Sequence, residues 1–403
     1  MGTQAETEKR NEPMKRILRC HDFVKNDIIR AENCYLYDKN NKRYVDFESG
    51  IWCAVVGHVN PRINKRIIEQ INNVVHLGYR FTNYLAEEAA VNLLDTISEK
   101  GGKCVFLSSG SEAVEFSINI AKLITGKNLM LTLSESYLGA YGSAGMKTDK
   151  WAKIDLRDCL NCKEIECFKD CTNLKNISWD NIGAFVFEPG SSSGKVKFPP
   201  KKLIQLIFKE IENSGGLVIV DEVTTGFGRT GKWYGFNHYK IRPDIIAFGK
   251  GLGNGYPVSA VAMKNEIATE LENNKFRYVQ SHQNDPLGCV IADEVIRIIK
   301  EEGLVNRSFA LGSKLIGYLN ELMKRFPFVK EVRGRGLMVG MEFSKSNHNL
   351  DVELLSNEML KRGFIVGVNA NANVIRFLPP LTIEEHEIEA LIENLGLVLE
   401  RMN

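Results

Sequence analysis

The chain has 403 residues, 44% of them hydrophobic and 25% charged, which is the composition of an ordinary folded protein. Its 52 Lys and Arg residues face 50 Asp and Glu residues, and a net charge of +2 argues against nucleic-acid binding as the main function. No apolar run approaches the roughly 18 residues of a membrane span, and the polar stretch 1–16 lacks the apolar core of a secretory signal. We therefore expect a cytoplasmic protein of two or three domains.

The first predicted element is a hairpin over 35–47, where two aromatic-rich runs flank an Asp-Lys-Asn-Asn turn. Short apolar runs then alternate with helical patterns, which predicts an α/β sheet that binds its ligand at the strand ends. The predicted strands are 105–108, 129–133, 184–188, 217–221, 245–248 and 259–263, and the predicted helices are 112–124 and 202–211.

After about residue 287 the pattern changes to long helices with short strands between them. The helices are predicted at 288–301, 309–325, 352–362 and 383–401, and the strands near 337–343 and 374–378. This pattern indicates a second, smaller α+β domain, into which the N-terminal hairpin packs. We expect residues 1–50 and 289–403 to form the small domain and residues 51–288 to form the large domain, with a mostly parallel central sheet.

Two charged residues each follow a buried apolar strand. Lys250 stands between glycines, directly after the strand 245–248, and such a site removes water from the amine and lowers its pKa. A lysine of lowered pKa is suited to form a Schiff base. Asp221 ends a neighbouring strand, where a carboxylate could keep a pyridinium nitrogen protonated. Together the two residues supply what a pyridoxal phosphate site needs.

The cofactor phosphate needs a cradle, and its ring needs a stacking partner. The segment Ser108-Ser109-Gly110-Ser111 ends a strand and opens a helix, where backbone N–H groups and the helix N-terminus favour an anion. Taken alone, such a segment is more often a simple helix N-cap. Tyr137 follows the next strand and is a candidate for stacking, although an isolated aromatic residue there is more often part of the core.

These pieces occur among longer motifs: Asp221-Glu-Val-Thr-Thr-Gly-Phe-Gly-Arg-Thr-Gly231, Arg242-Pro-Asp244, Gly249-Lys250-Gly251 and Gly255-Tyr-Pro-Val-Ser-Ala260. Further matches are Gly57-His-Val-Asn-Pro61, Ser109-Gly-Ser-Glu-Ala113, Glu188-Pro189 and Arg376-Phe-Leu-Pro-Pro-Leu381. With them the chain resembles, over roughly residues 33 to 400, the class III pyridoxal-phosphate aminotransferases. This family has fold type I and includes ornithine, acetylornithine and 4-aminobutyrate aminotransferases.

The resemblance implies a role for each matching residue around the cofactor. Lys250 forms the Schiff base and moves the proton, and Asp221 binds the pyridine nitrogen. Val223 and Tyr137 lie on the two faces of the ring. Ser109, Gly110 and Ser111 surround the phosphate, and Glu188 lies near the cofactor.

The resemblance also implies substrate and partner contacts. Arg376 is similar to the family arginine that pairs with a substrate carboxylate, although a salt bridge between domains is an alternative for it. Trp52 and Tyr79 align with regions that shape the substrate pocket, and each could equally be a core aromatic residue. Ser281 takes the place of a threonine that reaches the phosphate of the other subunit, which implies a homodimer with its active site at the subunit interface.

Three departures from the family pattern make the substrate uncertain. Leu138 stands where histidine is common, Gly190-Ser-Ser-Ser193 replaces Val-Gln-Gly, and Thr224 stands where glutamine is common. The expected reaction is the transfer of an amino group from an amino acid or ω-amine to a 2-oxo acid, in ping-pong half-reactions. A racemase, epimerase or decarboxylase reaction on the same cofactor is the alternative.

Two other features raise the question of a different class of protein. Gly226-Phe-Gly228-Arg-Thr-Gly231 matches the dinucleotide fingerprint, but no helical period follows it, so a dehydrogenase is not favoured. Four of the nine cysteines, Cys159, Cys162, Cys167 and Cys171, lie within a charged insertion. They could bind zinc or an iron–sulfur cluster, form disulfides or remain reduced thiols. A metal-binding scaffold without enzyme activity is a third hypothesis, which would leave Asp221 and Lys250 unexplained.

Overall fold

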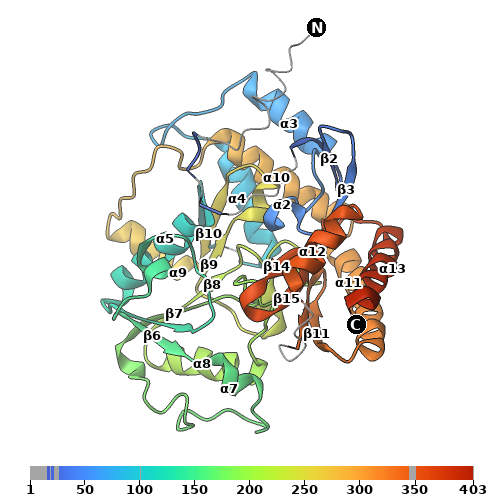
Figure 1. The fold of residues 1–403 in the computed structure, drawn as a ribbon. Coiled ribbons are helices and arrows are strands. Elements are labelled where there is room, and N and C mark those ends of the chain that lie inside the picture. The colour runs from blue at the N-terminus through green and yellow to red at the C-terminus, as the bar shows by residue number, and fades with distance from the viewer. Residues whose placement is uncertain (1–15, 19, 22–26, 100, 345–350, 403) are drawn as a thin grey trace.

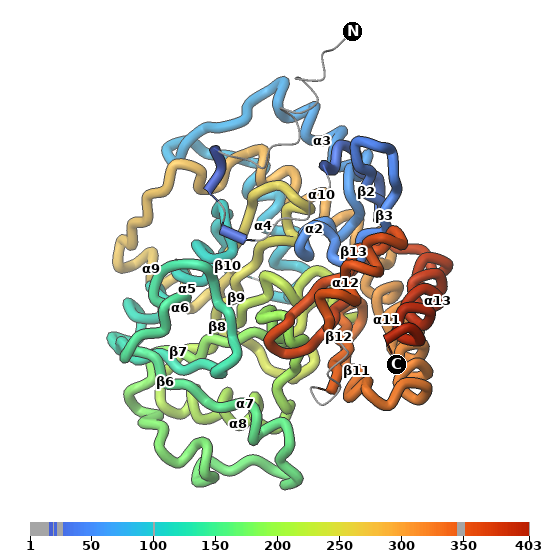
Figure 2. The backbone as a smooth tube through the Cα atoms, in the orientation of Figure 1, coloured from blue at the N-terminus to red at the C-terminus, as the bar shows by residue number. Residues whose placement is uncertain are grey.

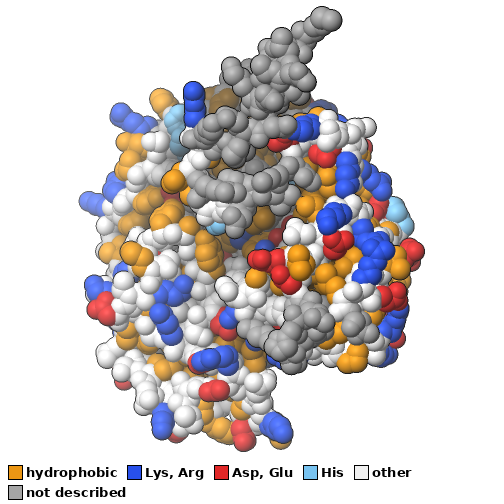
Figure 3. Space-filling model, in the orientation of Figure 1, with side chains coloured by type: hydrophobic (Ala, Val, Ile, Leu, Met, Phe, Trp, Pro, Cys, Tyr) orange, Lys and Arg blue, Asp and Glu red, His pale blue; other side chains and the backbone are white. Residues whose placement is uncertain are grey.

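A computed structural model describes residues 16–18, 20–21, 27–99, 101–344 and 351–402 (Figure 1). Nearly all of the N-terminal stretch 1–16, on which the expected localisation rests, lies outside these residues. Within the described ranges, no helix combines the length and the apolar content that crossing a bilayer requires. On the face drawn in Figure 3, basic and acidic side chains are interspersed, as the near-neutral net charge leads one to expect.

The largest sheet has seven strands in the order β4-β10-β9-β8-β7-β5-β6. All neighbours pair in parallel except β10, which is antiparallel to both β4 and β9. This sheet confirms the predicted α/β fold with a mostly parallel centre. Its strands are β4 (Lys103–Leu107), β5 (Leu129–Leu133), β6 (Trp151–Ile154), β7 (Ile182–Phe187), β8 (Leu217–Asp221), β9 (Ile245–Phe248) and β10 (Ser259–Met263).

Both faces of the sheet's central strands are buried, which explains why β7 and β9 are apolar along their whole length. In β8, Ile219 joins the core under α5 (Gly110–Thr125) and α9 (Asn265–Asn273). Val218 and Val220 point to the opposite face and join the core that includes α8 (Lys201–Asn213). The remaining helices near this sheet are α3 (Pro61–Ile71), α4 (Tyr84–Thr96), α6 (Gly142–Met146), α7 (Leu156–Leu160) and α10 (Pro286–Glu301).

A second part of the structure joins the two ends of the chain (Figure 2). The predicted hairpin is present as β2 (Tyr35–Asp38) and β3 (Arg43–Asp46), and β1 (Ile28–Glu32) pairs with β2. β13 (Phe364–Ile365) adds to β3 in parallel. The other elements are α2 (Ser49–Trp52), α11 (Leu304–Arg325), β11 (Val329–Arg335), β12 (Met338–Phe343), α12 (Val352–Lys361), β14 (Gly367–Asn369), β15 (Val374–Phe377) and α13 (Glu385–Met402).

The strands β11, β12, β15 and β14 form an antiparallel sheet in that order. The division into residues 1–50, 51–288 and 289–403 stays a prediction, and its second boundary falls inside α10. The segment that matches the dinucleotide fingerprint forms consecutive turns and opens no helix, in agreement with its rejection.

Candidate active site

Asp221 and Lys250 lie at the same edge of the seven-stranded sheet. Asp221 is the last residue of β8, and Lys250 opens a 3-10 turn directly after β9. Because β8 and β9 are parallel neighbours, with Asp221 opposite Ala247, their carboxyl ends meet. Lys250 has a φ of 39°, a left-handed conformation that is rare for a residue with a side chain and is common at functional sites.

The Lys250 amine is buried among a hydroxyl, an aromatic ring and two carboxylates. Its Nζ donates a hydrogen bond to Thr224 Oγ1 at 2.8 Å and lies 4.9 Å from the centre of the Trp52 ring. Burial lowers the pKa of Lys250, and the charges of Asp221 and Glu188 oppose that shift. A larger fraction of this amine is therefore neutral, and able to attack a carbonyl carbon, than in a lysine exposed to water.

Asp221 is buried and incompletely paired. Its Oδ1 accepts a hydrogen bond from the Val223 backbone N–H at 2.9 Å, and Oδ2 has no hydrogen-bond partner in the part of the chain that the structure describes. Burial, helped by the nearby Glu188 charge, raises the pKa of Asp221 to about 7. A protonated ring nitrogen would satisfy the free oxygen and stabilise its charge, so the carboxyl group fits a pyridine ring.

The turn between β4 and α5 is shaped to receive an anion. Ser109 caps α5, its hydroxyl accepting from the Glu112 N–H at 3.2 Å. A Cβ on Gly110 would lie 2.8 Å from two methyl carbons of Val223, so only glycine fits there. Ser111 is half-buried beside this turn, and its Oγ accepts from the Ala140 N–H at 2.9 Å. The N-terminus of a long helix, approached this closely, suits a phosphate.

Glu188 and Tyr137 are connected to each other. Glu188 Oε2 accepts a hydrogen bond from the Tyr137 N–H at 2.8 Å, and Oε1 accepts from the Ser192 hydroxyl. Burial raises the pKa of Glu188. The Tyr137 side chain is 49% exposed, so one side of it is open to a ligand.

Lys147 is a neighbour that the sequence did not reveal. Its Nζ donates to the Tyr137 carbonyl at 3.0 Å, and its pKa is lowered by burial against the attraction of Glu188 and Asp221. Lys147 lies at the end of the short helix α6, and no motif surrounds it.

Arg376 is held by a carboxylate on one side and an aromatic ring on another. Its Nε and Nη2 each donate to Glu48 at 3.1 Å, and its guanidinium carbon lies 4.9 Å from the Trp52 ring centre. Lys250 Nζ lies at the same distance from that ring. The Trp52 ring is therefore a neighbour of both Arg376 and Lys250. Glu48 was missed in the sequence, because it has no motif of its own.

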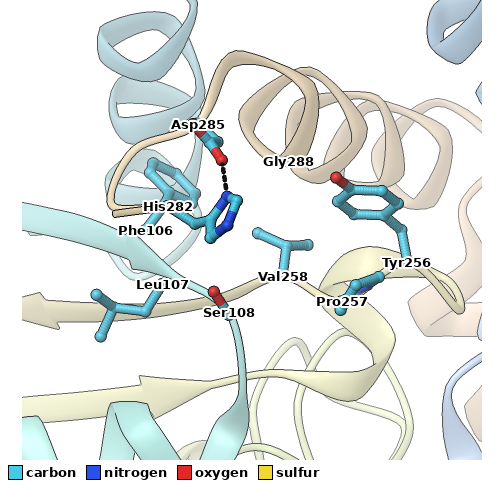
Figure 4. A pocket seen from close by; sticks show the side chains of 9 residues that line it. All are labelled: Phe106, Leu107, Ser108, Tyr256, Pro257, Val258, His282, Asp285 and Gly288. Carbon is cyan, nitrogen blue, oxygen red and sulfur yellow. Dashed lines mark hydrogen bonds and ion pairs between the residues drawn. The ribbon is translucent and has the colours of Figure 1, made fainter. Parts of the chain in front are cut away.

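Two expected site residues do not join this group within the chain. Tyr79 is 52% exposed and lines a separate surface depression with Phe116 and Tyr278. Ser281 is exposed and precedes His282, whose Nδ1 is 2.6 Å from Asp285 at the rim of a cavity beside Ser108 (Figure 4).

The buried lysine, the carboxylate at the next strand end and the anion site define a pyridoxal-phosphate-dependent enzyme of fold type I. Comparison with known proteins agrees with this class. Residues 19–399 match the family model of class-III aminotransferases.

Two relatives and one solved structure illustrate the match. The acetylornithine aminotransferase of Archaeoglobus fulgidus is 30% identical over 94% of this chain and 97% of its own length. The ornithine aminotransferase 1 of Staphylococcus aureus is 31% identical over 91% of this chain and 92% of its own. The crystal structure of a Bacillus anthracis aminotransferase superimposes with a TM-score of 0.90 at 26% identity and covers all of both chains.

The chain belongs to the class-III aminotransferase family. It is a transaminase that depends on pyridoxal phosphate, as the sequence predicted.

Proposed function

We propose that this transaminase takes the amino group from a donor that also carries a carboxylate and passes it to a 2-oxo acid. The observation that carries the proposal is the position of Arg376 and Lys250 beside the same Trp52 ring. An arginine fork recognises a carboxylate through two parallel hydrogen bonds. It would orient the donor while its amine reaches the cofactor.

Bound pyridoxal phosphate supplies an electron sink that lets the amino group move between carbon skeletons. The protein residues bind and position the reacting groups. Lys250 would supply the amine that holds the cofactor and would move the proton at the donor carbon, and Asp221 would keep the ring nitrogen protonated. The turn Ser109, Gly110 and Ser111 would receive the phosphate, and Val223 and Tyr137 would contact the ring.

Glu48 is already paired with Arg376. Its carboxylate accepts from Nε and Nη2, so a substrate carboxylate would share the guanidinium with Glu48 or replace it. The relatives named acetylornithine and ornithine aminotransferase suggest a donor with its amine at the far end from the carboxylate. Such a donor is an ω-amine and an amino acid at once.

The proposal is tested by an absorption spectrum of the purified enzyme during titration with amino acids and ω-amines. We expect a band of the lysine-linked cofactor that a donor bleaches and an added 2-oxo acid restores, and that Lys250→Ala lacks. A substrate that is consumed with the band unbleached, and without a 2-oxo acid, would indicate racemase or decarboxylase chemistry instead.

The working unit is a homodimer in the cytoplasm, in which Ser281 and Tyr79 complete the site of the neighbouring copy. The support is that neither residue joins the site of its own chain. Light scattering would give the stoichiometry. Inactive Lys250→Ala chains mixed with chains impaired by Ser281→Asp should regain activity, because one site of the hybrid is then intact. If the mixed chains recover no activity, Ser281 acts in the active site of its own chain.

A further inference from the structure

The connection from β6 to β7 has an unusual build for a parallel sheet. Successive parallel strands of one sheet are ordinarily joined through a full helix. Here the helix α7 is only five residues long, and the segment from Asn161 to Ser178 contains neither helix nor strand. Loops of more than about 12 to 15 residues without such structure are uncommon and are usually functional. Leu174 anchors the later part of this loop in the core, whereas Ile165 is 92% exposed and Phe168 58% exposed, so apolar burial contributes little to holding its middle part.

Four thiols from α7 and this loop line one cavity. Cys159, Cys162, Cys167 and Cys171 line one cavity of about 340 Å³, together with Leu203 of α8, and all four are free. The Cys162 N–H donates to the Cys159 carbonyl at 3.4 Å, which turns the chain between the first two thiols. The Cys171 N–H donates to the Phe168 carbonyl at 3.2 Å, which forms a second turn that ends at the last thiol.

Two polar groups lie within reach of sulfur atoms at this cavity. Lys202 Nζ lies 3.8 Å from Cys162 Sγ, and Asn173 Nδ2 donates to Cys159 Sγ at 3.5 Å. Donors directed at sulfur stabilise the thiolate. A divalent cation in the cavity would be bound by the sulfur atoms in their deprotonated form.

We propose that Cys159, Cys162, Cys167 and Cys171 form a structural site for one zinc ion, separate from the amino-transfer site. Four thiolates are the soft, tetrahedral ligand set that zinc prefers, at a Zn–S distance of about 2.3 Å. Binding replaces the thiol protons, which are released to water, and needs no oxidant.

The loop must tighten when the ion binds. Among the described residues, no three of the four sulfur atoms lie within 4.8 Å of one another. The segment 163–166 between the two turns contains no helix or strand, so it can adjust as the sulfurs move inward. Asp158, Glu164 and Glu166 also line the cavity and attract a cation to it. The ion would cross-link the exposed part of this crossover, around Ile165 and Phe168.

The test is a metal measurement on the whole protein, purified with a reductant and reconstituted with Zn²⁺. We expect one zinc per chain, retained after the cofactor is removed with hydroxylamine. Replacing zinc by Co²⁺ should give the intense thiolate-to-metal absorption and visible bands of a tetrahedral thiolate site. The double variant Cys159→Ser/Cys162→Ser should lose both signals, whereas Cys20→Ser, which changes an exposed cysteine outside the loop, should keep them.

Three results would overturn the zinc site. Zinc bound equally by the wild type and the double variant would place the metal elsewhere. Thiol titration of the unfolded, unreduced protein that finds the four cysteines already oxidised would assign disulfides. Iron and sulfide in anaerobically purified protein would assign a cluster. Because none of these results depends on turnover, failure of the zinc proposal is distinguishable from failure of the proposed transamination.

Discussion

At the scale of single residues, Thr224 positions the amine of Lys250 through a hydrogen bond. The hydrogen bond from Lys250 Nζ to Thr224 Oγ1, 2.8 Å long, is the only one that the amine makes in the described chain. We expect Thr224→Val to lower kcat about tenfold, since a bond to a charged group contributes roughly 1.5 kcal/mol or more. Thr224→Ser keeps the hydroxyl and should retain most of the activity. Equal loss in both variants, measured by steady-state kinetics, would mean that shape and not the bond matters.

Replacing Glu48 is expected to improve substrate binding. Glu48→Gln removes the charge that occupies Arg376, so the KM for carboxylate-bearing donors should fall about tenfold, a change of roughly 1.4 kcal/mol. A simple amine has no carboxylate for Arg376, and its KM should change little. Arg376→Lys should raise the KM of the first group only. If both groups of donors respond alike, Glu48 acts on the structure and not on specificity.

The sequence showed some of these residues and not others, for physical reasons. Asp221 and Lys250 were predictable because each follows an apolar strand, and parallel strands end at one edge. Glu48 lies 328 positions from Arg376, and only the folded chain brings the two together. Lys147 approaches the site through the backbone of Tyr137, which no spacing of residue types reveals.

At the scale of elements, the position of the α5 N-terminus depends on its close approach to the turn that follows β8. In Gly110→Ala, the new Cβ would meet Val223 at 2.8 Å and displace the helix N-terminus. Overpacking of this kind costs about 1 to 3 kcal/mol, so the Kd for pyridoxal phosphate should rise roughly 5- to 160-fold. The control is Gly317→Ala in α11, where nothing lies within 4 Å and helix stability should increase by about 1 kcal/mol. Fluorescence titration of the apoenzyme with pyridoxal phosphate measures the Kd of each variant, and that of Gly317→Ala should stay unchanged.

The 3-10 turn Gly235–His238 should make stability depend on pH. His238 Nε2 lies 3.2 Å from the Thr230 carbonyl, and burial lowers the pKa of His238 to about 4. Between pH 6.5 and 4 the unfolded chain therefore binds a proton that the folded chain does not, so stability falls as the pH falls. Calorimetry at pH 7.5 and 5 should show a loss smaller by about 1 kcal/mol in His238→Gln, after allowance for solvent screening. Identical losses of stability in the wild type and in His238→Gln would contradict the lowered pKa of His238.

The central strands were easier to predict than the peripheral ones. β8, β9 and β10 have the predicted bounds, because burial on both faces gives continuous apolar runs. β11 was missed, since its sequence Val-Lys-Glu-Val-Arg-Gly-Arg is largely charged and only partly buried. The start of α11 was placed five residues late, at 309, because its N-cap is Gly303 in a left-handed conformation, which is a typical helix end.

At the scale of the whole molecule, one buried arginine connects distant parts of the chain. Arg229 donates to the carbonyls of Pro379 and Leu337 and to the Ser49 hydroxyl. Arg229→Lys cannot reach all three, and loss from a buried charged network costs about 3 kcal/mol. We expect Tm to fall by about 3 °C in a chain of this length. Arg157→Lys, on a side chain that is 75% exposed, should leave Tm unchanged.

The pairing of β3 with β13 constrains the order in which the protein is built during translation. Val45 and Phe47 receive their backbone partners, Gly363 and Ile365, only after most of the chain has been synthesised. Until then the hairpin edge is unpaired while the seven-stranded sheet assembles beside it. Unpaired strand edges are templates for association with other chains. The β3 edge of the N-terminal hairpin is thus open to association with other chains for nearly the whole passage of the ribosome along the message.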